Sequence, residues 1–248
     1  MGKMMEHGGK TVFGASVGIL MLETRFPRIP GDMGNAATWP FPVHYRVVKG
    51  ATPGNVVRGD PRQQLDAFIT AGRDLVEMGC DGITTTCGFL SLLQEDLKEA
   101  LDVPVATSSL IQVPLIERLL PAERHVTVVT ISKGTLTEAH LAAAGARLDT
   151  PIIGTDSGRA FSESVLNDKA DIDFEACRQD LIAAGNEVRE RYPETGAIVL
   201  ECTNMVPFAA DIRKATGLPV YSIRSLITWF QSGLLPQKFP LELDDPRR

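Results

Sequence analysis

The chain has 248 residues, of which 44% are hydrophobic and 23% charged, and its formal net charge at pH 7 is -6. This composition excludes an intrinsically disordered protein, because the apolar content suffices for a core and the net charge is modest. The acidic excess argues against a nucleic-acid partner, since phosphates favour a basic surface. Four cysteines in a chain of this length make no disulfide framework, so we expect reduced thiols and a cytoplasmic protein.

The N-terminal region contains an apolar segment, 12–22, that imitates the core of a signal peptide. Residues 1–10 are expected to form a flexible leader before it. A glutamate, a threonine and an arginine follow the segment in place of a small-residue cleavage site. The segment is also much shorter than the roughly 20 residues that a membrane-spanning helix needs. We therefore predict a buried first strand at Ser16–Leu22 and no membrane partner.

Strands and helices alternate along most of the chain, which predicts an α/β fold with mainly parallel sheets and right-handed crossovers. The strands are short apolar runs rich in Val, Ile and Thr, as expected for strands buried on both faces. The clearest helix covers Pro61–Gly79 with Asp60 as its cap, and two more are expected at Ala176–Tyr192 and Met205–Ala215. Strands are predicted at Ser16–Leu22, Gly82–Thr86, Pro104–Ser108, His125–Ile131, Pro151–Gly154, Ala197–Glu201 and Pro219–Ile223.

A long stretch rich in proline and glycine, 23–59, interrupts this alternation. Such loops are uncommon inside a compact domain and tend to be binding loops or lids. This one leaves the carboxyl end of the first strand, where open α/β sheets place ligands, so we expect a lid. Asn35 and Thr38 are candidates for closing over a substrate, or else are only turn and cap residues. The alternative for the stretch is a surface excursion with a short hairpin at Val43–Val48.

An internal repeat relates the two halves of the chain. In each half a predicted strand is followed by a cysteine: Cys87 in GITTTCGF and Cys202 in GAIVLECTN. A helix follows in both halves, and Pro104 lies as far from Cys87 as Pro219 lies from Cys202. Two similar lobes that face each other would bring both cysteines to one cleft, facing one another.

The repeat leads to a prediction of two lobes after the leader. Lobe 1 is expected to comprise 11–110 and 220–248 and to carry the long loop 23–59. Lobe 2 is expected to comprise 111–219.

The four cysteines are of two kinds. Cys80 closes a helix and Cys177 lies early in another, and both are expected simply to pack. Cys87 and Cys202 each end a strand and open a helix, where free N–H groups and the helix dipole lower a thiol pKa and can also hold a substrate oxygen. None of the four histidines neighbours a cysteine in the sequence, so neither a Cys–His protease nor a zinc site is favoured.

A serine hydrolase is also disfavoured. Gly14-Ala15-Ser16-Val17-Gly18 matches the G-x-S-x-G nucleophile elbow, but that motif needs a strand before it and a helix after it. Here the apolar strand follows the serine.

The residues around the two cysteines resemble the cofactor-independent aspartate/glutamate/hydantoin racemase superfamily, which includes hydantoin and allantoin racemases, maleate isomerase and arylmalonate decarboxylase. The resemblance rests on TTCG around Cys87, ECTN around Cys202 and VTISKGT at 129–135, and it covers roughly 12–230. It implies flavodoxin-like lobes related by a pseudo-twofold axis, a site between them, no cofactor or metal, and a homodimer. The first strand lacks the Gly-Gly-Met-Gly loop usual in aspartate racemases, which argues against aspartate as the substrate.

These residues predict a racemase that takes a proton from the carbon next to a carboxylate and returns one to the opposite face. Cys87 and Cys202 are the expected base and acid, acting on an amino acid, a related small acid or a hydantoin. Backbone N–H groups and hydroxyls are expected to bind the carboxylate. The expected contacts are the N–H groups of Gly88, Phe89, Thr203 and Asn204 and the hydroxyls of Thr86, Thr135 and Thr203, and the resemblance adds Thr130.

Two alternatives stay open. A maleate-type cis–trans isomerase would keep the site and use Cys202 as a nucleophile that adds to a double bond. A bilobal small-molecule binder would share the architecture, although it has no need for two cysteines at the helix openings. A decarboxylase is disfavoured, because that branch lacks the first cysteine and this sequence has one.

Overall fold

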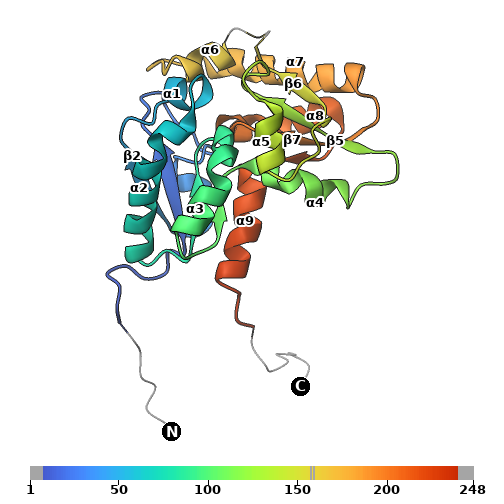
Figure 1. The fold of residues 1–248 in the computed structure, drawn as a ribbon. Helices are drawn as coiled ribbons and strands as arrows, with labels where there is room; N and C mark the ends of the chain where they lie inside the picture. Colours follow the sequence, from blue (N-terminus) through green and yellow to red (C-terminus); the bar gives the residue numbers. More distant parts are fainter. Residues whose placement is uncertain (1–7, 157, 159, 240–248) are drawn as a thin grey trace, which may run out of the picture.

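The computed structural model describes residues 8–156, 158 and 160–239. Most of the expected leader, 1–7, and the end of predicted lobe 1, 240–248, lie outside the described residues. The structure confirms the α/β fold class. It contains two four-stranded sheets, all of whose neighbouring strands are parallel, with helices packed around them (Figure 1).

The first sheet is built from the N-terminal half of the chain and has the order β2-β1-β3-β4. One of its two central strands, VGILML, is buried at every position, as a strand covered on both faces must be. The strands are β1 (Val17–Leu22), β2 (Val43–Val48), β3 (Gly82–Thr85) and β4 (Val105–Ala106).

The second sheet repeats this arrangement, with the order β6-β5-β7-β8. In both sheets the first strand along the chain lies between the second and the third, so the repeat seen in the sequence is a repeat of topology. The strands are β5 (His125–Thr130), β6 (Ile152–Gly154), β7 (Thr195–Leu200) and β8 (Val220–Tyr221). The predicted lobe boundary before residue 220 lies at the start of β8, which pairs with β7; the lobe limits stay a prediction.

The helices follow the predicted positions. The predicted helix at 61–79 begins as a 3-10 turn, η2 (Pro61–Gln64), capped by Asp60, and continues as α2 (Leu65–Glu77). No helix in the described part of the chain is long and apolar enough to cross a membrane. The other elements are η1 (Ala36–Thr38), α1 (Pro53–Val57), η3 (Gly88–Leu93), α3 (Gln94–Ala100), η4 (Ser109–Gln112), α4 (Val113–Glu117), α5 (Glu138–Ala143), α6 (Phe161–Leu166), α7 (Phe174–Arg191), η5 (Thr203–Phe208), α8 (Ala209–Thr216) and α9 (Ile223–Leu234).

The long segment 23–59 is more ordered than a loop. It contains η1, β2 and α1, and β2 pairs in parallel with β1 from Val17↔Val43 to Leu22↔Val48. The alternative of a short hairpin at Val43–Val48 is therefore wrong. All six residues of that segment form one strand, whose partner is the strand that precedes the segment.

The ends of β3 and β7 meet where the two sheets face each other. The Thr203 hydroxyl donates a 2.8 Å hydrogen bond to the carbonyl of Thr86. The Ser109 hydroxyl, which follows β4, donates a 2.6 Å bond to the carbonyl of Leu200. A Cβ at Gly88 would lie 2.2 Å from Oε1 of Glu201 and 2.4 Å from its carbonyl oxygen, so only glycine allows this approach.

The structure predicts that Gly88→Ala destabilises the junction between the sheets. Because the clash involves a carbonyl oxygen as well as a buried side chain, one strand end must move, and we expect a cost of about 1–3 kcal/mol. Gly134→Ala is the matched control, since a Cβ there has no atom within 4 Å. Chemical denaturation of both variants measures the effect, and equal unfolding free energies for the two would contradict it.

Candidate active site

Both repeated cysteines lie at the ends of their strands and face one pocket. Cys87 follows β3 and caps η3, and Cys202 follows β7 and caps η5. Both contribute to the wall of the same pocket, which encloses about 350 Å³ of space between atoms, open solvent at its mouth included. They are 8% and 7% exposed, so a ligand that reaches them leaves most of its water behind.

The rest of the pocket wall is mostly apolar and comes from both halves of the chain. The segment after β1 forms one side of the wall with Thr24, Phe26 and Arg28, and its role as a lid stays a prediction. Arg28 is the one cationic side chain among the described residues that line it. The remaining lining residues are Leu22, Pro53, Val57, Thr86, Phe89, Ile131, Val165, Leu166, Glu201 and Asn204.

The environment of the two thiols contradicts the expected lowering of their pKa values. Burial raises the pKa of both Cys87 and Cys202 well above the ordinary thiol value, and the nearby Glu201 carboxyl raises them further. The N–H groups of Phe89 and Leu90 face the Cys87 sulfur and favour its thiolate, and the N–H of Asn204 does the same for Cys202. Desolvation outweighs these few dipoles, because each cysteine begins a 3-10 segment in the interior.

Glu201 is the functional candidate that sequence reasoning missed. It is 1% exposed, and its Oε2 accepts hydrogen bonds from the Thr130 hydroxyl at 2.8 Å and from the N–H of Ile131 at 3.4 Å. Burial raises the pKa of this carboxyl to about 7, although the two hydrogen bonds lower it. The available signal was its position, since LECTN places a charged residue directly after a buried apolar strand and beside a cysteine.

A polar chain ties the segment after β1 to the second cysteine. The Cys202 thiol lies 3.6 Å from Oδ1 of Asn204, and the amide of Asn204 donates a 2.6 Å bond to Asp32. Asp32 in turn pairs with Arg28 at 2.7 Å, with side chains only 5% and 11% exposed. Arg28 also donates to Thr24 at 3.0 Å. The charge of Arg28 is therefore largely matched inside the protein.

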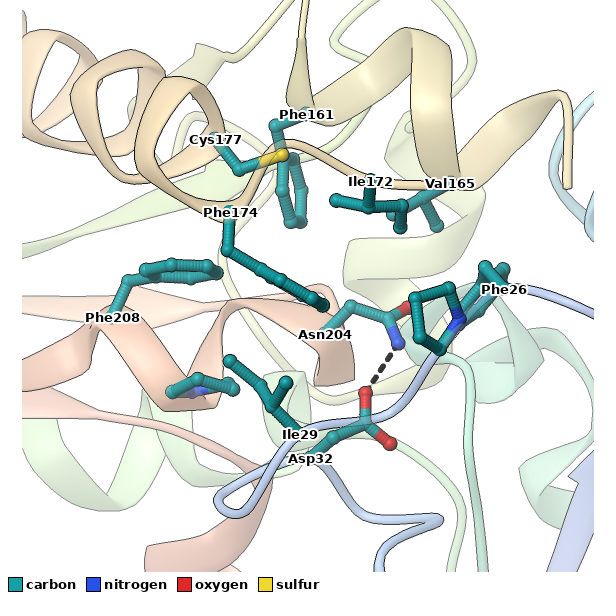
Figure 2. Close-up of a pocket in the computed structure, with 12 residues that line it drawn as sticks. Phe26, Ile29, Asp32, Phe161, Val165, Ile172, Phe174, Cys177, Asn204 and Phe208 are labelled. Atoms are coloured by element: carbon teal, nitrogen blue, oxygen red, sulfur yellow. Dashed lines mark hydrogen bonds between the residues drawn. The ribbon is translucent and has the colours of Figure 1, made fainter. Parts of the chain in front are cut away.

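A second pocket lies on the other side of the Asn204–Asp32 pair. Figure 2 shows the hydrogen bond between these side chains beneath a cluster of aromatic rings. Phe26, Val165 and Asn204 belong to both pockets, so the two are neighbours. The phenylalanines of the second pocket are Phe26, Phe161, Phe174 and Phe208.

The predicted substrate contacts fall into three groups. Thr86, Phe89 and Asn204 line the pocket with both cysteines. Gly88, Thr203 and Thr130 lie directly behind it, where they join the strand ends or hold Glu201. Thr135, Asn35 and Thr38 are not among its described lining residues.

Hydrogen bonds within their own segments engage the members of the last group. Thr135 donates to Ser132, Thr38 donates to the carbonyl of Asp32 at 2.6 Å, and Asn35 caps η1. Asn35 and Thr38 therefore act as cap and turn residues in this structure, as the alternative predicted. Substrate contact by any of the predicted residues stays a prediction.

The other two cysteines are buried away from this pocket. All four cysteines are free thiols. Cys177 lines the aromatic pocket, and Cys80 packs under the first sheet. Burial raises the pKa of each to about 11.

Solved structures with the same architecture cover nearly the whole chain. Aspartate racemase from Picrophilus torridus is 14% identical and superimposes with a TM-score of 0.57 over 92% of this chain and 96% of its own. Glutamate racemase from Bacillus anthracis is 16% identical, with a TM-score of 0.57 over 88% of this chain and 82% of its own. Arylmalonate decarboxylase is also 16% identical, with a TM-score of 0.55 over 90% of this chain and 94% of its own.

The chain has the fold of these two racemases and of arylmalonate decarboxylase. The two flavodoxin-like halves expected from the resemblance are thus observed. No family model matches the sequence.

Curated proteins with similar sequences carry a different name from the racemases. The dimethylsulfoniopropionate lyase of Durusdinium sp. clade D is 27% identical, over 89% of this chain and 75% of its own length. Dimethylsulfoniopropionate lyase 7 of Emiliania huxleyi is 28% identical, over 89% of this chain and 67% of its own length. The relatives by sequence and by fold are enzymes, and this supports an enzyme here. Because the sequence relatives are named lyases, the expected isomerase class is not shown.

The raised pKa of Glu201 predicts a pH-dependent penalty on stability. The pKa of this carboxyl is about 7 in the folded protein, against an ordinary value of 4.5. Between these pH values the folded protein holds a proton that the unfolded chain has lost. The stabilisation from this group is therefore complete below pH 4.5 and is lost as the pH rises to 7. The difference in unfolding free energy between wild type and Glu201→Gln should therefore change by about 3 kcal/mol in favour of the variant over this interval. Denaturation at the two pH values measures it, and a constant difference would contradict the burial argument.

Proposed function

We propose that the protein is a cysteine-dependent lyase that removes a proton next to a carboxylate and expels a leaving group from the neighbouring carbon. The substrate class is a small acid with a good leaving group at C3, with dimethylsulfoniopropionate as the example. The observation that carries the proposal is the meeting of Cys87 and Cys202 in one buried, largely apolar pocket. The names of the sequence relatives, 27–28% identical over 89% of the chain, support the choice of leaving group.

Elimination and racemisation share their first step. A cysteine thiolate takes the proton from C2 of the acid, so that an S–H bond forms and a C–H bond breaks. In the elimination, the electron pair left on C2 forms the C2=C3 double bond. The C3–S bond breaks with its pair on sulfur, and dimethyl sulfide leaves. Acrylate remains, and the proton is later lost from the thiol to water.

The apolar walls of the pocket suit a dimethylsulfonium group. Leu22 and Phe89 offer surface to its methyl groups, and aromatic faces attract a cation. The Phe26 ring, in contrast, already carries the Arg28 guanidinium 4.6 Å from its centroid. The substrate cation also lowers the cost of a thiolate in the same dry pocket, because opposite charges at close range stabilise each other where water is excluded. The thiol pKa values are raised in the protein without substrate, and we expect a bound cationic substrate to lower them.

Racemisation remains the second candidate, because the pocket holds two thiols rather than one. An elimination needs one base, whereas inversion needs a proton donor on the opposite face, and a second cysteine is suited to that role. Retention of optical activity by chiral amino acids, hydantoins and hydroxy acids after incubation with the protein would exclude it. Conversion of maleate to fumarate would identify the cis–trans isomerase instead.

The proposal predicts that the protein releases acrylate and dimethyl sulfide from dimethylsulfoniopropionate and that this depends on the pocket cysteines. Replacement of the base by serine should reduce the rate at least about 100-fold, because a serine hydroxyl is a far weaker acid than a thiol and supplies no base near neutral pH. Gas chromatography of dimethyl sulfide compares Cys87→Ser and Cys202→Ser with the wild type.

Cys80→Ser and Cys177→Ser are the matched controls, since both thiols are buried outside this pocket. Both controls should retain turnover. Wild-type rates in Cys87→Ser and Cys202→Ser alike would rule the mechanism out, and so would an absence of dimethyl sulfide from the wild-type reaction.

A further inference from the structure

The proposed elimination leaves the carboxyl group of Glu201 without a role. This side chain lies at the junction of the two strand ends, with Oε1 against Gly88, and Glu201 is one of the residues that line the cysteine pocket. Oε2 accepts hydrogen bonds from the Thr130 hydroxyl and the Ile131 N–H. Oε1 is buried and has no hydrogen-bond partner within the described part of the chain. A buried polar atom without a hydrogen-bond partner costs folding free energy, unless a ligand supplies the partner.

The hydrogen bonds assign the position of a proton on this carboxyl. Both donors point at Oε2, so that oxygen acts as the acceptor, and a proton on the neutral acid belongs on Oε1. A protonated Oε1 is a donor without an acceptor. Its natural partner in the pocket is an oxygen that carries negative charge, since hydrogen bonds to charged acceptors are the stronger ones.

The surrounding charges favour the neutral acid. Among the described residues, the titratable or charged side chains that share the pocket wall with Glu201 are Cys87 after β3, Cys202 after β7 and Arg28 of the segment after β1. Both thiols are protonated near neutral pH because their pKa values are raised. Arg28 is paired with Asp32 at 2.7 Å, so no unmatched cation among the described lining residues compensates a Glu201 anion.

We propose that Glu201 binds the substrate as a carboxylic acid, its Oε1–H donating a hydrogen bond to the substrate carboxylate. The inference rests on the proposed function only in taking the substrate to be a carboxylate. During proton removal, negative charge from C2 spreads onto that carboxylate, so this hydrogen bond strengthens as the reaction proceeds. Glu201 keeps its proton throughout, and the thiol remains the group that exchanges one with carbon.

Proton linkage gives the proposal a measurable signature. Free Glu201 has a pKa of about 7, and only its protonated form binds the anion. Above pH 7, binding must therefore take up a proton from solution, and the dissociation constant should rise about tenfold for each further pH unit. Below pH 6 the acid is already protonated, so binding should take up no proton and should not depend on pH.

The experiment is isothermal titration calorimetry with 4-methylpentanoate, the carbon isostere of dimethylsulfoniopropionate, which has no leaving group and does not react. Titrations at about pH 5.5, 7 and 8.5 in buffers of different ionisation enthalpy count the protons taken up per ligand. The wild type should take up close to one proton at the highest pH and none at the lowest. Glu201→Gln should bind without proton uptake and with a flat pH profile, because an amide donates without titrating.

Two further arms keep the result unambiguous. Thr130→Val removes one hydrogen bond to Oε2 that lowers the Glu201 pKa, so the onset of proton uptake should move to higher pH. This arm tests the proposal even if Glu201→Gln does not fold. The neutral ligand 4-methylpentanamide should bind the wild type without proton uptake.

Three results would overturn the inference. They are wild-type binding of 4-methylpentanoate that is independent of pH, no binding at any pH, and binding that strengthens with proton release above pH 7. The last would indicate an ionised Glu201 that faces a cation. Failure of the proposed function is separate, because a protein that binds 4-methylpentanoate as described but releases no dimethyl sulfide contradicts only the lyase.

Discussion

The contact between Gly88 and Glu201 is the constraint on which the site depends. There is no room for a Cβ at Gly88, because the carboxyl and the carbonyl oxygen of Glu201 occupy that space. The Thr203 hydroxyl holds the same two strand ends together through the carbonyl of Thr86. Two sheets with identical topology thus meet at their cysteine-bearing tips. As a consequence, two thiols and a carboxyl share a pocket in which all three are largely shielded from solvent.

Burial of three acidic groups in one place determines the electrostatics of the pocket. Each would be ionised more readily in water, and desolvation is the largest cause of the raised pKa at all three. A few backbone N–H groups at the start of a 3-10 segment are not enough to reverse it. A substrate that brings both a cation and a carboxylate would supply the missing partners, the cation for a thiolate and the carboxylate for the Glu201 acid.

The sequence was informative wherever a local pattern determines local structure. Apolar runs predicted β1, β3, β5 and β7 closely, and equal spacing after Cys87 and Cys202 predicted the repeat. The strand β2 was missed as part of the first sheet because it follows a long proline-rich segment and pairs with a distant strand. Its pairing is decided by tertiary contacts, which no short window of sequence records.

The candidate site was predicted in part for the same reason. The cysteines stand out because they recur at the same place in the two halves, whereas Glu201 occurs in one half only. Arg28 and Asp32 belong to a segment whose path over the pocket depends on the fold. The predicted direction of the thiol pKa shifts was wrong. The prediction used the position of each cysteine at a helix start, which the sequence shows. The burial that raises the pKa values depends on how the two halves of the chain assemble.

The most direct test of the central claim is the rate at which acrylate forms in a single turnover of dimethylsulfoniopropionate labelled with deuterium. Substrate with deuterium at C2 should react more slowly than unlabelled substrate, because the C2–H bond breaks when the cysteine thiolate takes the proton. Substrate labelled at C3 is the control and should react at nearly the unlabelled rate. Equal rates for the C2-labelled and unlabelled substrates, or slowing only with the C3 label, would contradict proton removal next to the carboxylate.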